Sequence, residues 1–222
     1  MNHYLDDDAK RVLEKLHREF PVAPREEFEG WSAPALDVLD CVLSLNRHYD
    51  KFCLPRVEKF RETHAEITTL ASLLELIESY PTPLDFSEKE LGYHDEQRAA
   101  TLAGVVKSLL QAQKAFNHSE ERSRLKAWAQ SVKPGDYEKF GVRGFGLSGF
   151  QYLRMLFGVQ TIKPDVHIRR FVSDAVGRPV GDEDALALME VAGKHLEWPL
   201  SRLDYAIWDR GARATFKIST PL

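Results

Sequence analysis

Two short segments of this 222-residue chain carry the residue types best suited to chemistry. The first is VRGFG, residues 142–146, called here the glycine hairpin, in which Gly144 and Gly146 flank Phe145. Glycine lets the backbone adopt conformations that a Cβ forbids, and the helix expected after Gly146 begins with amides that lack intrahelical acceptors. Such amides can hold an anion. An ordinary turn between helices is the alternative, because a lone Gly-x-Gly before a helix is a common pattern.

The second segment is PDVHIRRF, residues 164–171, where Asp165 follows a proline at the expected start of a helix. Asp is a usual N-cap residue, so a plain helix cap is one interpretation. A carboxylate in such a place can also stabilise a developing positive charge and orient or deprotonate water. The residue type and position therefore make Asp165 the candidate catalytic residue, with capping as the alternative.

In this order and spacing, the two segments resemble the helix-hairpin-helix DNA glycosylase superfamily, which includes endonuclease III and the adenine glycosylase. The sequence VRGFG is similar to the family's hairpin, and PDVHIRRF is similar to the segment around its catalytic aspartate. The resemblance covers roughly residues 30–212, and its motifs lie in residues 142–171. It implies that backbone amides near Gly144, Gly146 and Ser148 grip the DNA backbone and that Asp165 is catalytic.

The resemblance implies a base-excision repair enzyme. Its substrate is double-stranded DNA with a damaged or mismatched base, which is flipped out of the stack before its N-glycosidic bond is hydrolysed. Lyase members of the family carry a Schiff-base lysine two residues after the second hairpin glycine, and here Ser148 stands there. We therefore expect a monofunctional glycosylase, although Lys163 lies close to Asp165 and leaves lyase chemistry open. The alternative is a non-catalytic helix-hairpin-helix DNA-binding or assembly protein.

No cofactor is expected. The cysteines, Cys41 and Cys53, form no CxxC pair and are interpreted as buried small hydrophobic residues. Many members of the family carry a four-cysteine iron–sulfur cluster near the C-terminus, but the tail ARATFKISTPL has no cysteine, so no cluster is expected. The eight histidines lack metal-ligand spacing, so no metal site is predicted. The resemblance allows a monovalent cation at the glycine hairpin.

The net charge of −4 is unusual for a nucleic-acid binder, but charge distribution matters more than the sum. Residues 133–170 hold seven basic and three acidic residues, a local excess of four positive charges. This excess predicts a DNA-facing patch in which Arg143 and Arg169 contact phosphates. Solvated helix faces are the alternative, and Arg154 fits that description well. The predicted DNA-binding residues are Gly144, Phe145, Gly146, Ser148, Arg143, Arg169 and Asn46.

Asn46 is included because SLNRHYDKF, residues 44–52, resembles the place where the family inserts a polar side chain into the gap left by the flipped base. Members similar to endonuclease III usually carry glutamine there. Asparagine is shorter, and an asparagine at a helix C-terminus is the alternative interpretation.

Helical apolar spacing along nearly the whole chain predicts an all-α fold. Helices are expected over residues 7–20, 36–50, 68–80, 95–116, 182–196 and 201–214, after Ser119 as an N-cap, after the glycine hairpin and from Asp165. The resemblance implies one glycosylase-like unit (residues 1–222) with two helical lobes, a helix-hairpin-helix motif and an interlobe cleft for the base. Residues 34–158 would form the central lobe, which ends in the hairpin, and residues 1–33 plus 159–222 the second, discontinuous lobe.

The chain lacks the basic and apolar regions of a signal peptide, and no apolar run approaches the length of a membrane span. We expect a monomeric cytoplasmic protein, associated with the nucleoid in a bacterium or located in the nucleus of a eukaryote, without a membrane partner.

Overall fold

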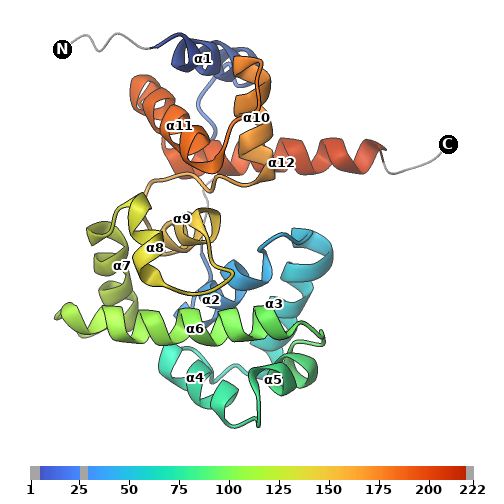
Figure 1. The fold of residues 1–222 in the computed structure, drawn as a ribbon, viewed down its shortest axis with the longest axis vertical. Coiled ribbons are helices and arrows are strands. Elements are labelled where there is room, and N and C mark those ends of the chain that lie inside the picture. Colours follow the sequence, from blue (N-terminus) through green and yellow to red (C-terminus); the bar gives the residue numbers. More distant parts are fainter. Residues whose placement is uncertain (1–5, 26–29, 219–222) are drawn as a thin grey trace. The chain divides into compact units, whose positions relative to one another are not determined.

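The computed structural model describes residues 6–25 and 30–218, with side chains through residue 211. Every regular element in these ranges is a helix, which confirms the prediction of an all-α fold (Figure 1). The chain divides into two compact units: unit 1 consists of Met1–Glu29 and Gln160–Leu222, and unit 2 of Gly30–Val159. Among the helices of the described ranges, none combines the length and apolar character needed to traverse a bilayer.

Unit 1 joins the two ends of the sequence. Its helices are α1 (Asp7–Glu19), α10 (Val166–Val176), α11 (Asp182–Leu196) and α12 (Leu200–Ile218). Helix α1 packs against α10 and α11, and α10 packs against both α11 and α12. Val12 and Leu16 of α1 are fully buried, and Lys15 Nζ donates to the carbonyl of Phe171 at 3.0 Å. Burial of this one apolar face therefore fixes α1 to elements more than 150 residues away along the chain.

Unit 2 is built around α6 (Glu96–Ala112), which has α2 (Pro34–Leu43) on one side and α4 (Leu70–Glu78) and α5 (Pro83–Glu90) on the other (Figure 1). Helix α9 (Leu147–Leu156) packs on α2 and on α7 (Glu121–Ser131). The remaining elements are the π-helical turn η1 (Tyr49–Cys53), α3 (Leu54–Thr63), the 3-10 turns η2 (Gln113–Ala115) and η3 (Pro134–Asp136), and α8 (Tyr137–Phe140).

The helix predicted over residues 36–50 is wrong in its second half. Helix α2 ends at Leu43, and Asn46 has a left-handed φ of 51° in the turn that follows. Asparagine tolerates this conformation better than most residues, because its short polar side chain can bond locally. The predicted N-cap is also displaced, since Glu120 rather than Ser119 precedes α7.

Besides the four-residue α8, two helices, α3 and α5, were not predicted. Each has a proline in its first turn, where the missing N–H costs nothing because that donor has no intrahelical acceptor in any case. Thr82 caps α5 by accepting a hydrogen bond from the amide of Asp85 at 3.2 Å. The proline-rich segment PTPLDF, residues 81–86, therefore contains the start of a helix.

Helix α2 is buried along its whole length, although it carries two aspartates. Asp37 is 0% exposed; its Oδ1 accepts from the amide of Trp31 at 2.7 Å and its Oδ2 from Arg122 Nη2 at 2.7 Å. Burial raises the pKa of Asp37 to about 7, and the nearby Arg122 guanidinium only partly offsets the burial. A side chain on Gly30 would lie 2.7 Å from Asp37 Oδ1, so only glycine fits beside this carboxyl group.

Asp40, one turn further along α2, is also buried and has three donors. Trp31 Nε1 and the Tyr49 hydroxyl donate to Oδ2 at 2.7 Å each, and the Tyr152 hydroxyl donates to Oδ1 at 2.9 Å. Burial, together with the Asp40 charge, raises the pKa of both tyrosines, so both remain protonated donors. The cysteines Cys41 and Cys53 are buried, as predicted, and form no disulfide bond.

The raised pKa of Asp37 predicts a pH-dependent stability. Between pH 3.8 and about 7 the folded protein keeps a proton on Asp37 that the unfolded chain has lost, so the free energy of unfolding decreases as the pH rises through this interval. At about 1.4 kcal/mol per pKa unit, this contribution reaches at most about 4 kcal/mol.

Urea denaturation of wild type and Asp37→Asn at pH 5, 6, 7 and 8 measures this effect. We expect a steeper decline in wild type than in the variant, by about 1 kcal/mol or more over the range. Asp50→Asn, at an exposed position of the same unit, is the control and retains the wild-type slope. Parallel slopes in wild type and Asp37→Asn would contradict the prediction.

Candidate functional site

The glycine hairpin is a tight turn between α8 and α9. The amide of Phe145 donates to the carbonyl of Val142 at 3.1 Å, and Gly144, the third residue of this turn, has a φ of 81°. A positive φ at that position is typical of a type II turn and favours glycine. Gly146 is extended and serves as the N-cap of α9. Of the two hairpin glycines, Gly144 is thus the one whose conformation requires glycine.

Two side chains of α6 hold the glycine hairpin from behind. The Thr101 hydroxyl lies 2.8 Å from the carbonyl of Arg143, and Gln97 Nε2 lies 3.4 Å from the same oxygen. A Cβ on Gly144 would stand 2.9 Å from Thr101 Oγ1. The hairpin is therefore fixed to the central helix of unit 2 by contacts that sequence reasoning missed, because Thr101 and Gln97 belong to no local motif.

The side chain of Phe145 points into the core. It is 5% exposed, and its ring centroid lies 5.7 Å from that of Phe140. Phe140 in turn contacts Trp128 and Phe150, so the aromatic rings form one continuous cluster. Phe145 was predicted to bind DNA. Its ring has a packing role in this structure, and only its backbone could take part in binding.

The start of α9 offers backbone donors. The first amides of an α-helix have no intrahelical acceptor, and Gly146 has no side chain to cap them. Gly146 is exposed and Ser148 is half-buried. The carbonyls of Val142 and Arg143 accept hydrogen bonds from the Phe145 amide and from the side chains of α6. The arrangement of donors suits an anion such as a phosphate.

The turn that carries Asn46 lies in the same unit, beside the beginning of α9. A Cβ on Gly149 would stand 2.9 Å from Leu45 Cδ2, so the chain just before Asn46 packs closely on α9. Arg98 Nη1 of α6 donates to the carbonyl of Val42 at 2.7 Å, which ties the end of α2 to the same helix that holds the glycine hairpin. Asn46 itself is exposed. Unit 2 thus brings together two of the predicted DNA-binding segments.

The predicted basic patch draws its residues from both units. Its members before residue 160 belong to unit 2, whereas Lys163, Arg169 and Arg170 belong to unit 1. Arg154 is 7% exposed and donates to the carbonyl of Ala129 at 3.1 Å, so it is neither a DNA contact nor the solvated residue that the alternative described. Arg169 Nε lies 3.2 Å from Asp182 Oδ1. Arg143 is exposed and remains the clearest candidate for a phosphate contact.

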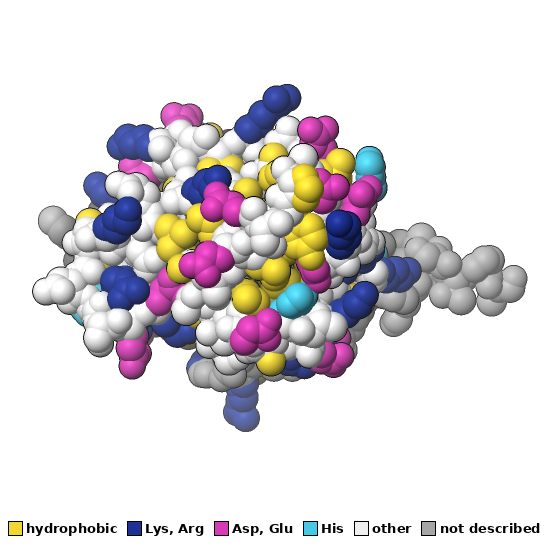
Figure 2. Space-filling view, turned by 90° about the horizontal axis from the view of Figure 1, so that it is seen from below, with side chains coloured by type: hydrophobic (Ala, Val, Ile, Leu, Met, Phe, Trp, Pro, Cys, Tyr) yellow, Lys and Arg dark blue, Asp and Glu magenta, His cyan; other side chains and the backbone are white. Residues whose placement is uncertain are grey.

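Figure 2 shows the face of unit 2 that carries α4 and α5. Apolar side chains gather at its centre, and charged side chains of both signs surround them. Because Lys and Arg do not gather there, this face lacks the basic footprint of a nucleic-acid contact. Beside the glycine hairpin, by contrast, an open groove of about 680 Å³ is lined by Gln97, Gly104, Lys107 and Arg143, among other residues.

Asp165 is the N-cap of α10, as the capping interpretation predicted. Its Oδ1 accepts hydrogen bonds from the amides of His167 at 2.8 Å and Ile168 at 3.2 Å. Its other oxygen, Oδ2, makes no hydrogen bond with the described residues, and the side chain is half-buried. One carboxylate oxygen is therefore occupied by the helix, and the other remains available for chemistry.

A second carboxyl group, that of Asp204 in α12, lies near Asp165. It was not identified from the sequence. It is 7% exposed, and its Oδ1 accepts a hydrogen bond from the amide of Lys163 at 2.7 Å. Burial, reinforced by the negative charge of Asp165, raises the pKa of Asp204 well above its ordinary value. An aspartate inside the apolar stretch LDYAIW was the available signal.

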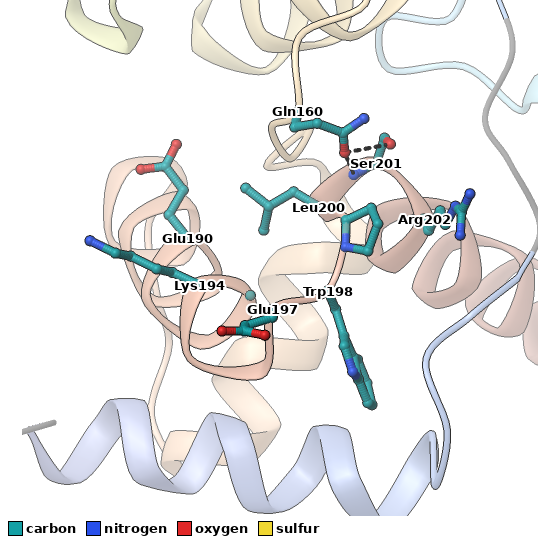
Figure 3. Close-up of a pocket in the computed structure, with 10 residues that line it drawn as sticks. Gln160, Glu190, Lys194, Glu197, Trp198, Leu200, Ser201 and Arg202 are labelled. Carbon is teal, nitrogen blue, oxygen red and sulfur yellow. Dashed lines mark hydrogen bonds between the residues drawn. The ribbon is translucent and has the colours of Figure 1, made fainter.

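A separate pocket of about 640 Å³ lies in unit 1 between the end of α11 and the start of α12 (Figure 3). Leu200 points toward Glu190 and Lys194 of α11. Gln160 Oε1 accepts from the Ser201 amide at 3.3 Å, at the start of α12, and from the Ser201 hydroxyl at 2.9 Å. Trp198 turns away from these groups, and its ring meets His17 edge-on. No residue of the predicted site lines this pocket.

Comparison with known proteins identifies a family. The chain belongs to the family described as Domain of unknown function (DUF8548), whose model matches residues 9–212. No curated protein matches the chain. No solved structure matches it either. The match includes residues of both units.

Gly144→Ala should destabilise the protein more than a glycine substitution that introduces backbone strain alone. Gly92→Ala is the matched control, because Gly92 has a positive φ of 63° but open space around a new Cβ. The strain of a left-handed residue costs roughly 1–2 kcal/mol, and the contact with Thr101 adds to it in Gly144→Ala.

Denaturant unfolding compares the two variants. We expect Gly144→Ala to lose at least about 1 kcal/mol more than Gly92→Ala. Equal losses would show that the contact with α6 does not constrain the glycine hairpin.

Proposed function

We propose that this protein is a DNA glycosylase similar to the helix-hairpin-helix superfamily, which hydrolyses the N-glycosidic bond of a damaged or mismatched base without cutting the strand. The observation that carries the proposal is that the two carboxylate oxygens of Asp165 differ in their contacts. Oδ1 caps α10, and Oδ2 makes no hydrogen bond with the described residues. This open oxygen is available to orient a water molecule or to face a developing positive charge.

The reaction needs what Asp165 can supply. When the C1′–N bond breaks, its electron pair leaves with the base, and positive charge develops on the deoxyribose. A carboxylate beside that charge stabilises the transition state electrostatically. Water then bonds to C1′ and gives up a proton, and the departing base gains one. Oδ2 of Asp165 is suited to orient this water or to accept its proton.

Binding would come from the glycine hairpin. Its backbone donors at the start of α9 favour a phosphate, and Arg143 adds an exposed positive charge. Contacts with phosphates position the duplex, but they do not distinguish one base sequence from another. At Ser148 the side chain is a hydroxyl, which cannot form an imine with the sugar. The expected product is therefore an abasic site in an unbroken strand.

A non-catalytic DNA-binding protein on the same scaffold is the second candidate. The observation in its favour is that the two amide contacts of Asp165 Oδ1 already explain an aspartate at the start of α10. Base release from duplexes that contain uracil, alkylated bases, oxidised bases or mismatches distinguishes the two functions. An intact release activity supports the glycosylase, and no release from the whole panel supports the binding protein.

Asp165→Asn separates the cap from the chemistry. Asparagine retains an acceptor oxygen for the α10 amides, so stability should change little. It lacks the negative charge, and excision should slow by at least about a hundredfold, at tenfold for each 1.4 kcal/mol of lost stabilisation. Single-turnover base release measures the rate, and circular dichroism checks folding.

Asp184→Asn, at an exposed position of unit 1, is the matched control and should excise at the wild-type rate. If Asp165→Asn matched it, Asp165 would have no part in catalysis.

Arg143→Glu should weaken binding to undamaged duplex DNA and lower the slope of log K against log salt by about one unit, as expected for one lost phosphate contact. Lys114→Glu makes the same charge change on the same unit, beyond the far end of α6 and roughly 20 Å along that helix from Thr101 at 1.5 Å per residue. Fluorescence anisotropy at four salt concentrations compares the variants. Equal weakening by both substitutions would mean that the effect is one of net charge.

A further inference from the structure

Asp204 is a buried acid in an otherwise apolar part of α12. Its neighbours along the helix, Leu203 and Ile207, are buried core residues. The Lys163 amide donates a hydrogen bond to Asp204 Oδ1 at 2.7 Å, across 41 residues of sequence. Lys163 lies two residues before Asp165. The carboxyl group of Asp204 therefore holds the chain immediately before the start of α10.

Helix α12 makes a second contact with this part of the chain, at α10, two turns further along α12. A Cβ on Gly211 would stand 2.4 Å from His167 Nδ1, so the His167 ring occupies the space that a side chain would need. Residues seven apart lie on the same face of a helix, which places Asp204 and Gly211 on the face of α12 toward α10. Helix α12 thus contacts the chain both before Asp165, at Lys163, and after it, at His167.

We propose that Asp204 is a positioning residue for Asp165: its buried carboxyl group holds the Lys163 amide and thereby fixes the turn from which Asp165 enters α10. The proposal rests on the proposed glycosylase function for its catalytic consequence. Its structural part, the restraint on residues 163–165, is independent of that function.

The electrostatics of the segment agree with this role. The charges that act on Asp204 are those of Asp165, which disfavours a second negative charge nearby, and Lys163, which partly opposes this effect. Burial is the larger cause, and burial and the Asp165 charge both raise the pKa of Asp204, which favours its neutral form. A neutral carboxyl group still accepts an amide hydrogen bond, and it adds no negative charge beside Asp165. An asparagine at position 204 should therefore accept the same hydrogen bond and perform the same role.

The test compares Asp204→Asn, Asp204→Ala and the surface control Asp184→Ala. Single-turnover excision at saturating enzyme and the affinity for damaged duplex separate the chemical step from binding. Asp204→Asn should remain within about threefold of wild type. Asp204→Ala should slow excision by at least about tenfold, because a displaced catalytic group loses this much readily, with affinity changed less than about twofold.

The pH–rate profile tests whether Asp204 acts on Asp165 through its charge. If Asp204 is neutral, Asp204→Asn leaves the midpoint of the acid limb within about 0.3 pH unit of wild type. A downward shift of about one unit would overturn the proposal, because it would mean that an ionised Asp204 had acted on Asp165. Wild-type excision by Asp204→Ala, measured well below its unfolding temperature, would also overturn it.

Amide hydrogen exchange tests the restraint without any activity. Exchange at Lys163 and at His167, whose amide Asp165 caps, should be at least about tenfold faster in Asp204→Ala than in wild type and unchanged in Asp204→Asn. If wild type released no base from any duplex, the glycosylase function would fail while the restraint would still be judged by this exchange. Unchanged protection in Asp204→Ala would overturn the proposal.

Discussion

Burial of α2 is the constraint on which unit 2 depends. A helix enclosed on all sides must satisfy every polar group it carries, and this one carries two aspartates. Trp31 alone donates to both, through its amide and its indole, while Arg122 and Tyr152 bring α7 and α9 to the same helix. Removing one partner from such a network costs several kcal/mol, because the remaining group stays buried. The network therefore specifies the arrangement of helices as well as stabilising it.

The shape of the glycine hairpin follows from this core. Cys41 of α2 donates to the carbonyl of Gly149 at 3.3 Å, so the first turn of α9 lies directly on the buried helix. Phe145 joins the aromatic cluster on one side, and Thr101 holds Arg143 on the other. The outer surface of the turn presents backbone groups and the exposed Arg143 side chain. The backbone donors are pre-organised, because they have no rotamer to fix when an anion binds.

Local signals in the sequence were sufficient where the physics is local. The all-α fold follows from apolar periodicity, and Asp165 is a cap because of its residue type and its proline neighbour. The predictions were wrong where long-range packing decides. Asn46 leaves the helical conformation although its neighbours continue the helical pattern, and the charged Arg154 is buried because a distant carbonyl accepts its hydrogen bond.

Asp204 and Thr101 illustrate the same limit at the candidate site. Each lies inside a helix whose residues have ordinary core spacing, and neither is part of a motif. Their partners, Lys163 and Arg143, are 41 and 42 residues away along the chain. Periodicity reveals which face of a helix is buried, but not which backbone group that face will meet. These supporting residues could be identified only from the folded structure.

Unit 1 combines the N-terminal and C-terminal parts of the sequence, and this affects the order in which the units fold during synthesis. Arg11 of α1 bonds to the carbonyl of Val176, 165 residues later. At roughly 5–20 residues per second, α1 waits roughly 10 to 30 seconds for α10 to emerge from the ribosome, whereas all of unit 2 lies between them and can condense first. Throughout that interval the apolar face of α1 has no partner. Nascent chains of this protein thus pass through a stage in which an amphipathic helix is open to chaperones and to other nascent chains.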